Sequence, residues 1–262
     1  MGRVLSYYKK EEDKLVEEYL SQHIRCCIDL MSKLELSRLG KAGISLDEDF
    51  PNIVRLSIIF HDLGKAFYRR RNDENTIYFT GHEILSAYIL NKFKIEFTRK
   101  DLYRLEKISR MLKPALFAVA FHHHPMGVEK RLESMGKLER TGRLKLSSTC
   151  LDDLRNELSY IGNILNADEK ELLNKVLEDI KWSVEKGLLG IGEIKQEFHN
   201  IEKDIFEYFT SGKYEDVILK KLSYLTLTAL ISADYISAAN IRGGKTRFGD
   251  ITDEFYRFYL NP

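Results

Sequence analysis

The segment that decides the fold runs from Pro51 to Lys65 and reads PNIVRLSIIFHDLGK. Its first part is largely apolar, which is typical of a helix buried in a protein core. Proline suits the first turn of such a helix, because no amide hydrogen is needed there. The segment therefore predicts a central helix that delivers His61 and Asp62 from the interior.

Helical periodicity over long stretches predicts an all-α protein with no β-sheet. Apolar spacing across residues 11–39 predicts one amphipathic helix with His23 on its buried stripe. A long last helix, residues 214–240, is expected to return Asp234 to the core. Distant parts of the chain are thus expected to meet at one place.

The 262-residue chain can bury one substantial core, so we expect a single domain over residues 1–262. Residues 148–210 hold amphipathic helices without a chemical motif, and we interpret them as an inserted helical lobe. Residues 128–145 are rich in lysine and arginine and contain two glycines, which predicts a mobile basic connection.

Overall composition narrows the classes of function. Basic and acidic residues nearly balance at 41 to 40, so no global field draws the chain to nucleic acid or membrane. The three cysteines form no metal-type pair, which favours a reducing, cytoplasmic setting. No long uncharged run predicts a membrane span.

Most of the seven histidines fall in short motifs beside apolar runs. These motifs are HD at 61–62, GHE at 81–83, HHH at 122–124 and SAD at 232–234. Imidazoles and carboxylates are costly to bury unless something binds them. Nitrogen and oxygen donors without thiolates favour Mn, Fe, Co, Ni or Zn, and their number exceeds one tetrahedral site. Two ions about 3.5 to 4 Å apart would use all of them and activate water.

Each motif alone has an ordinary structural explanation. His82 can cap the helix after Gly81, three histidines can lie on a surface, and Asp234 can be a buried, hydrogen-bonded carboxylate. The order HD, H, HH, D on apolar helices disfavours these explanations together. His199 is expected to face solvent or to pack. Residues 239–246 match a loose P-loop pattern, but they follow a helix where a P-loop needs a strand.

The motif order resembles that of the HD superfamily of metal-dependent phosphohydrolases, an all-helical fold. HDLGKAF, the GHE that follows and the histidine pair before a glycine turn look most like the HD nuclease of type I CRISPR interference, in its stand-alone form without the helicase. The resemblance implies two divalent ions, such as Mn, Ni, Co or Mg, with zinc also allowed. It further implies a superfamily 2 helicase on a separate chain and a CRISPR effector complex as partners.

The resemblance also implies the ligand set. His23, His61, Asp62 and Asp234 would surround a first metal. Asp62, His82 and two of the three consecutive histidines would surround a second one. Which two is ambiguous, and we choose His123 and His124 over His122 because they adjoin the turn. Asp62 is expected to bridge the metals, and Lys65 to help neutralise the phosphate.

Two basic stretches, residues 69–71 and 128–145, are expected to flank the site and to track a nucleic-acid backbone. We therefore expect cleavage of single-stranded DNA without sequence preference, with RNA and R-loop strands as further substrates. One alternative is a phosphohydrolase of nucleotides or cyclic dinucleotides. Another is a catalytically idle helical subunit.

Overall fold

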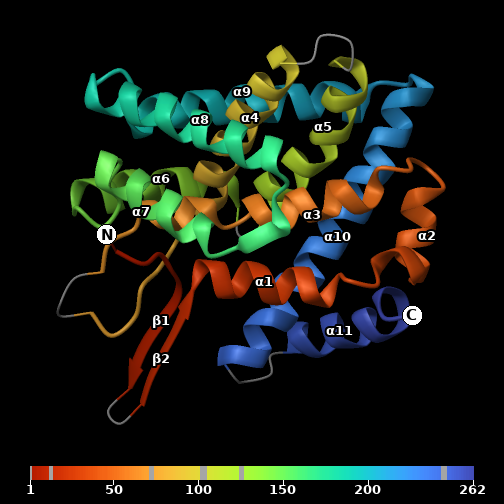
Figure 1. The fold of residues 1–262 in the computed structure, drawn as a ribbon, viewed down its shortest axis with the longest axis horizontal. Coiled ribbons are helices and arrows are strands. Elements are labelled where there is room, and N and C mark those ends of the chain that lie inside the picture. The colour runs from red at the N-terminus through yellow and green to blue at the C-terminus, as the bar shows by residue number, and fades with distance from the viewer. Residues whose placement is uncertain (1, 12–13, 71–73, 101–104, 124–126, 243–246) are drawn as a thin grey trace.

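The computed structural model describes residues 2–11, 14–70, 74–100, 105–123, 127–242 and 247–262. At its centre lies α3 (Phe50–Phe60), with Pro51 in its first turn as predicted. Most side chains of this helix are buried, and it packs against α1, α5 and α10 (Figure 1). The apolar segment therefore forms the central helix that its composition predicted.

The remaining helices and strands lie around α3. They are β1 (Leu5–Glu11), β2 (Lys14–Tyr19), α1 (Leu20–Leu30), η1 (Leu34–Leu36), α2 (Arg38–Ile44), η2 (Leu63–Phe67), α4 (His82–Lys100), α5 (Leu105–Phe121), α6 (Val128–Arg140), α7 (Ser148–Ser159), η4 (Gly162–Ile164), α8 (Ala167–Glu185), α9 (Ile191–Thr210), α10 (Tyr214–Arg242), α11 (Arg247–Phe255) and the π-helical turn η5 (Tyr256–Leu260).

The packing of α10 explains how the end of the chain reaches the centre. This long helix contacts α5, α3 and α1, while α4 packs against α5, α8 and α9. In Figure 1, α8 and α9 run along one side of the molecule and α1 and α11 along the other. The prediction of an all-α fold is confirmed, apart from one small sheet.

That sheet corrects the prediction that the chain has none. Strands β1 and β2 pair antiparallel, with Tyr8 opposite Glu17 and Lys9 opposite Val16. Ser6 and Tyr8 are buried on alternate positions of β1, the period of a strand. The single helix expected over residues 11–39 is consequently wrong: this region holds β2, α1, η1 and α2. Tyrosines and Val16 favour the strand locally.

The expected mobile connection at residues 128–145 is also wrong over most of its length. Residues 128–140 form α6, and Leu132 and Met135 on it are buried. With Val128, these residues have the spacing of one helical face, which the many charges around them obscured. The helix packs against α9.

The helices of residues 148–210 share their hydrophobic cluster with the rest of the described chain. The boundary of an inserted lobe therefore stays a prediction. The P-loop-like segment begins inside α10, and residues 243–246 of it lie outside the described residues. Within the described residues, no helix is long and apolar enough to cross a membrane.

Candidate metal centre

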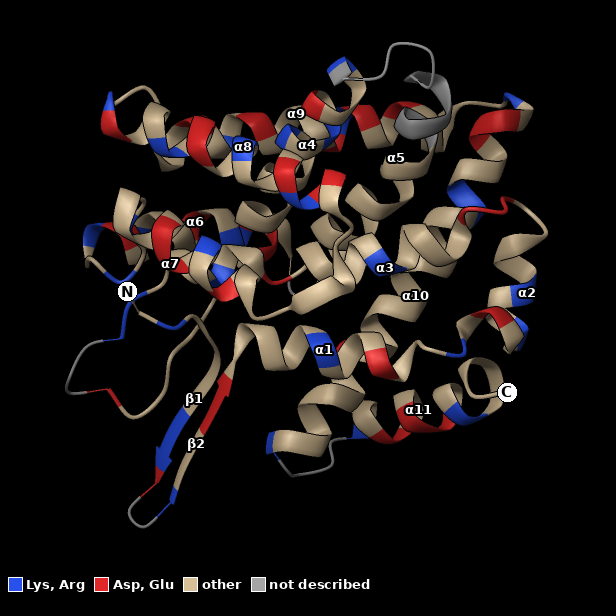
Figure 2. Ribbon diagram, viewed as in Figure 1, with Lys and Arg blue, Asp and Glu red and all other residues tan. Residues whose placement is uncertain are grey.

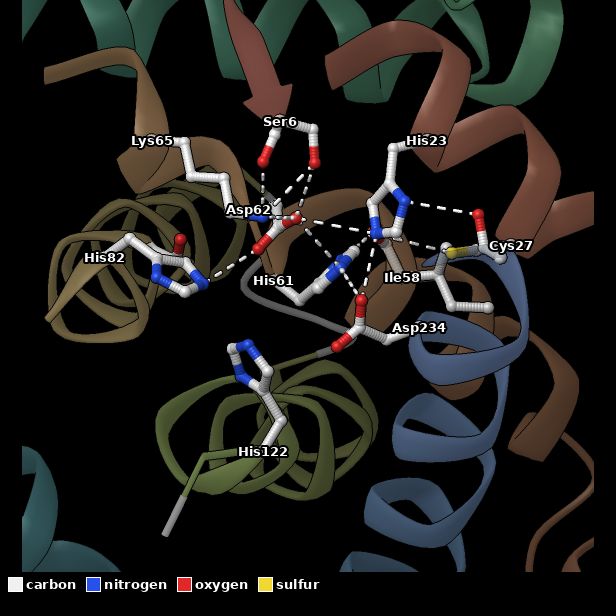
Figure 3. Close-up of polar contacts among 12 residues, drawn as sticks. Ser6, His23, Cys27, Ile58, His61, Asp62, Lys65, His82, His122 and Asp234 are labelled. Atoms are coloured by element: carbon white, nitrogen blue, oxygen red, sulfur yellow. Dashed lines mark hydrogen bonds and ion pairs between the residues drawn. The ribbon is translucent and has the colours of Figure 1, made fainter. Parts of the chain in front are cut away.

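Five predicted ligands, together with His122, come from five places in the fold and converge on one buried point. His23 lies on α1, His61 and Asp62 directly follow α3, and His82 begins α4. His122 directly follows α5, and Asp234 lies on α10. Figure 3 shows their side chains pointing toward one another. Rings and carboxylates buried in this way need polar partners.

Three of the histidines are held in the same way. The Nδ1 atom of His61 donates to the carbonyl of Ile58 at 2.7 Å. His82 and His122 likewise donate to carbonyls three residues earlier, at 2.6 and 2.9 Å. A proton fixed on Nδ1 leaves the lone pair of Nε2 free to bind a metal.

The Nε2 atoms of these three rings point into the centre. All three are buried, and none makes a hydrogen bond. That of His82 lies 2.8 Å from Oδ1 of Asp62, but without hydrogen-bond geometry. Buried acceptors without donors are rare in folded proteins. A divalent cation is a partner that fits three such lone pairs.

The first ligand group contains His23, His61, Asp62 and Asp234, whose ligand atoms all lie within 4.8 Å of one another. Nε2 of His23 is 3.1 Å from Oδ1 of Asp234 and 3.5 Å from Oδ2 of Asp62. Nε2 of His61 is 3.4 Å from the same oxygen of Asp62. This is the set of four residues that the resemblance implied for a first metal.

His23 is oriented by an acidic residue that sequence reasoning missed. Nδ1 of His23 lies 2.8 Å from Oε1 of Glu18, which is fully buried. The other oxygen of Glu18 accepts from Arg242 at 2.9 Å. A carboxylate behind a ligand histidine fixes the ring and raises its basicity. Burial works against a charged ring, but contacts with Cys27, Asp234 and Glu18 raise the pKa of His23 well above its usual value.

The second ligand group contains His82, His122 and His123, again within 4.8 Å of one another. The rings of His122 and His123 are 4.1 Å apart between centroids. Because α5 ends at Phe121, these two residues lie just outside the helix and both face His82.

Among the described residues, this group differs in one member from the histidine pair that we chose from the sequence. We selected His123 and His124, but His122 is the buried ring whose Nε2 lies free in the centre. His124 lies outside the described residues. His123 lies in the group and stays a predicted ligand.

Asp62 lies between the two groups. Its Oδ2 faces His23 and His61, and its Oδ1 faces His82. Burial alone would raise the pKa of Asp62, but His61 and Lys65 hold it well below the usual range. An ionised carboxylate with one oxygen toward each group has the geometry of a bridging ligand.

The surrounding rings are held neutral. Burial lowers the pKa of His61, and lowers that of His122 further with help from His123. Burial and the neighbouring His82 lower the pKa of His123 to about 3. Neutral imidazole is the form that binds a metal, so no proton has to leave these three rings at neutral pH.

Lys65, which we expected to help neutralise the phosphate, contacts the carboxylate of Asp62. Its Nζ lies 2.6 Å from Oδ2 of Asp62 and 3.2 Å from Oγ of Ser6. Ser6 also donates to Asp62 at 3.4 Å. Sequence reasoning missed Ser6 because it missed β1, although the alternation of that strand is a signal that could have revealed it.

The remaining predicted residues lie elsewhere. His199 is exposed on α9 and pairs with Glu202, away from the centre. Arg69 pairs with Asp153, Arg70 stacks on a tyrosine, and residue 71 lies outside the described residues. Figure 2 shows acidic and basic residues interspersed along α6 and α7. The two basic stretches flanking the site stay a prediction.

A helical bundle with these two histidine and aspartate groups defines a class, the metal-dependent phosphohydrolases. A family model described as HD domain matches residues 22–154, just over half of the chain. The chain belongs to the HD domain family. No curated protein and no solved structure that was compared matches it. The match includes His23 through His123, while Asp234 lies beyond it.

Proposed function

We propose that this chain is a metal-dependent nuclease that hydrolyses phosphodiester bonds of single-stranded DNA in CRISPR antiviral defence. The observation that supports hydrolysis of a phosphoester is the pair of ligand groups joined by Asp62. The family assignment supports the same chemistry. The DNA substrate, a helicase partner on a separate chain and an effector complex rest on the motif resemblance described above.

His23, His61, Asp62 and Asp234 would hold one divalent ion. Asp62, His82, His122 and His123 would hold a second. Two ions held in this way would supply a water of lowered pKa and would stabilise the attacking and leaving oxygens of a phosphoester. Since water is the nucleophile, no side chain of the protein has to form a covalent intermediate.

The protein's own residues orient this centre. Asp62 presents one oxygen to each ligand group, and the backbone carbonyls behind three histidines fix their tautomer. The side chain of Asp234 is 14% exposed, whereas those of His23 and His61 are fully buried. Substrate would therefore reach the centre from the side where Asp234 and His123 are partly exposed. Lys65 places a cationic charge beside Asp62, where it would offset the charge of the phosphate.

The decisive experiment is hydrolysis of a labelled single-stranded DNA by chelator-stripped protein, with Mn, Ni, Co, Mg or Zn added back. Asp62→Ala is the test variant, and His199→Ala is the matched control, since His199 is an exposed histidine away from the centre. We expect cutting restored by at least one metal, kept by the control and lost in a folded Asp62→Ala protein.

Other outcomes would point to the alternatives. If nucleotides or cyclic dinucleotides are hydrolysed and block the cutting of DNA, the substrate class is wrong and the site hydrolyses nucleotides. If no metal restores hydrolysis of either substrate, the chain is an idle subunit. If folded Asp62→Ala protein retains cutting, the bridging role of Asp62 is wrong.

A further inference from the structure

A buried thiol lies beside the first ligand group. Cys27 follows His23 by four residues on α1, so the two side chains lie on the same face of that helix. Cys27 is fully buried, and its Sγ lies 3.8 Å from Nε2 of His23. Figure 3 shows the sulfur on the far side of His23 from Lys65. The HD motifs do not include this residue.

A second observation marks the same place as a ligand position. Nε2 of His61 is buried and makes no hydrogen bond, so this ring has a nitrogen available for an ion. The ligand atoms of His23, Cys27 and His61 all lie within 4.8 Å of one another. Zinc bonds of about 2.0 to 2.3 Å to nitrogen and sulfur place tetrahedral ligand atoms about 3.5 Å apart. The separation between Sγ and Nε2 of His23 is close to that value.

We propose that His23, Cys27 and His61 form an alternative metal position that takes a thiophilic ion such as zinc. Thiolate and imidazole ligands suit zinc, whereas Asp62 and Asp234 suit harder ions such as manganese and magnesium. On binding, the S–H bond of Cys27 breaks, its proton passes to solvent, and the sulfur forms a bond to the ion. No oxidation or reduction takes place.

The two positions exclude each other. Both use His23 and His61, and each ring has one nitrogen left for an ion, because its Nδ1 faces Glu18 or the carbonyl of Ile58. An ion drawn toward Cys27 therefore leaves the carboxylates of Asp62 and Asp234 without the ion that they would otherwise share. Zinc thus competes with the divalent ion that the first ligand group would otherwise hold. This inference rests on the metal binding of the proposed function, not on its substrate.

The test uses chelator-stripped full-length protein and cobalt(II) as a spectroscopic probe for zinc. A thiolate ligand gives cobalt an intense charge-transfer band in the near ultraviolet, while bound cobalt without thiolate shows only its weaker visible bands. Cys27→Ser and Cys27→Ala are the test variants. Cys26→Ser is the matched control, because Cys26 is the adjacent cysteine and belongs to none of the ligand groups among the described residues.

We expect the charge-transfer band in the wild-type protein and in Cys26→Ser, and its loss in both Cys27 variants. Zinc should also bind Cys27→Ser at least about 10-fold more weakly, since even outer residues of a metal site contribute 10-fold or more. In a titration of manganese-loaded protein, zinc should displace one equivalent of manganese at a lower concentration from wild type than from Cys27→Ser.

Visible cobalt bands without the charge-transfer band in wild-type protein would overturn this inference and leave the proposed metal site intact. A charge-transfer band that persists in both Cys27 variants would overturn it as well. Protein that binds no cobalt, zinc or manganese would overturn both the inference and the metal binding of the proposed function.

Discussion

At the scale of single residues, the centre depends on side chains that hold its ligands from behind. Backbone carbonyls fix the rings of His61, His82 and His122, and Glu18 fixes His23. Each of these contacts fixes the proton on the outer ring nitrogen, so the inner nitrogen faces the other ligands. Removal of a ligand should therefore abolish the binding of one metal, whereas removal of the contact behind it should only weaken that binding.

The first prediction concerns which consecutive histidines bind metal. His122→Ala should lose one equivalent of metal and lower hydrolysis by about 100-fold or more, because a direct ligand contributes at least as much as an outer contact. Metal content and hydrolysis rate are the measurements, with His124→Ala for comparison. Full metal content in His122→Ala together with loss in His124→Ala would show that our assignment of the second group is wrong.

The second prediction concerns support for His23. Glu18→Gln removes the charge behind Nδ1 of His23 and should weaken binding at the first ligand group by about 10-fold to 100-fold. Calorimetric titration with manganese measures this change. Glu17→Gln is the matched control, since Glu17 is the exposed neighbour on the same strand. Equal affinities for the two variants would contradict a supporting role for Glu18.

At the scale of elements, the centre depends on how closely η2 approaches α4. A Cβ atom on Gly64 would lie 2.1 Å from the carbonyl oxygen of His82 and 2.8 Å from Cβ of Leu85. The amide of Gly64 also donates to Ser86 on α4 at 2.9 Å. This contact joins the turn that carries Lys65 to the helix that begins with His82, so a glycine is required there.

The third prediction follows from this contact. Gly64→Ala should lower the free energy of unfolding by about 1 to 3 kcal/mol, the usual cost of overpacking, and should reduce metal content. Denaturant unfolding and metal analysis are the measurements. Gly192→Ala is the control, since a Cβ there meets nothing within 4 Å on helix α9, and it should be neutral or slightly stabilising. Gly64→Ala protein as stable as wild type would refute the required close approach.

At the scale of the whole molecule, Glu157 on α7 ties the start of the chain to the bundle. It accepts from Arg3 at 2.6 Å and from the backbone amide of Ser21 at 3.0 Å. Burial raises the pKa of Glu157, but hydrogen bonds from Arg3 and Ser21 outweigh it and leave the pKa lowered. This contact holds the hairpin and α1 beside α7, and so holds Ser6 and His23 in place.

The fourth prediction is the pH dependence of that contact. A lowered pKa in the folded state stabilises the fold above the unfolded value of about 4.3, and this contribution is lost as the pH falls through the folded pKa. Wild-type protein should therefore lose more stability on acidification below about pH 4.3 than Glu157→Gln protein does. Unfolding free energies measured across this pH range test it, and equal slopes would contradict it.

Local patterns in the sequence predicted the central helices and indicated most of the centre. The apolar run before His61 predicted α3, and the periodicity around Asp234 predicted α10, because both helices are continuous and strongly apolar. The resemblance to the HD superfamily then implied a group of His23, His61, Asp62 and Asp234, which the structure brings together. Residue types that are costly to bury indicated the centre before its geometry was known.

Only the tertiary structure decided which side chains support the centre and which histidines face it. Ser6 and Glu18 reach it through the hairpin of β1 and β2. The hydrogen bonds between these strands join residues at positions that helical periodicity in the sequence does not reveal. His122 faces inward because α5 ends one residue earlier, and element ends are the least certain part of a sequence pattern. The thiol of Cys27 becomes a candidate ligand only because it lies near His61. The two residues are far apart along the chain, so only the folded protein places them together.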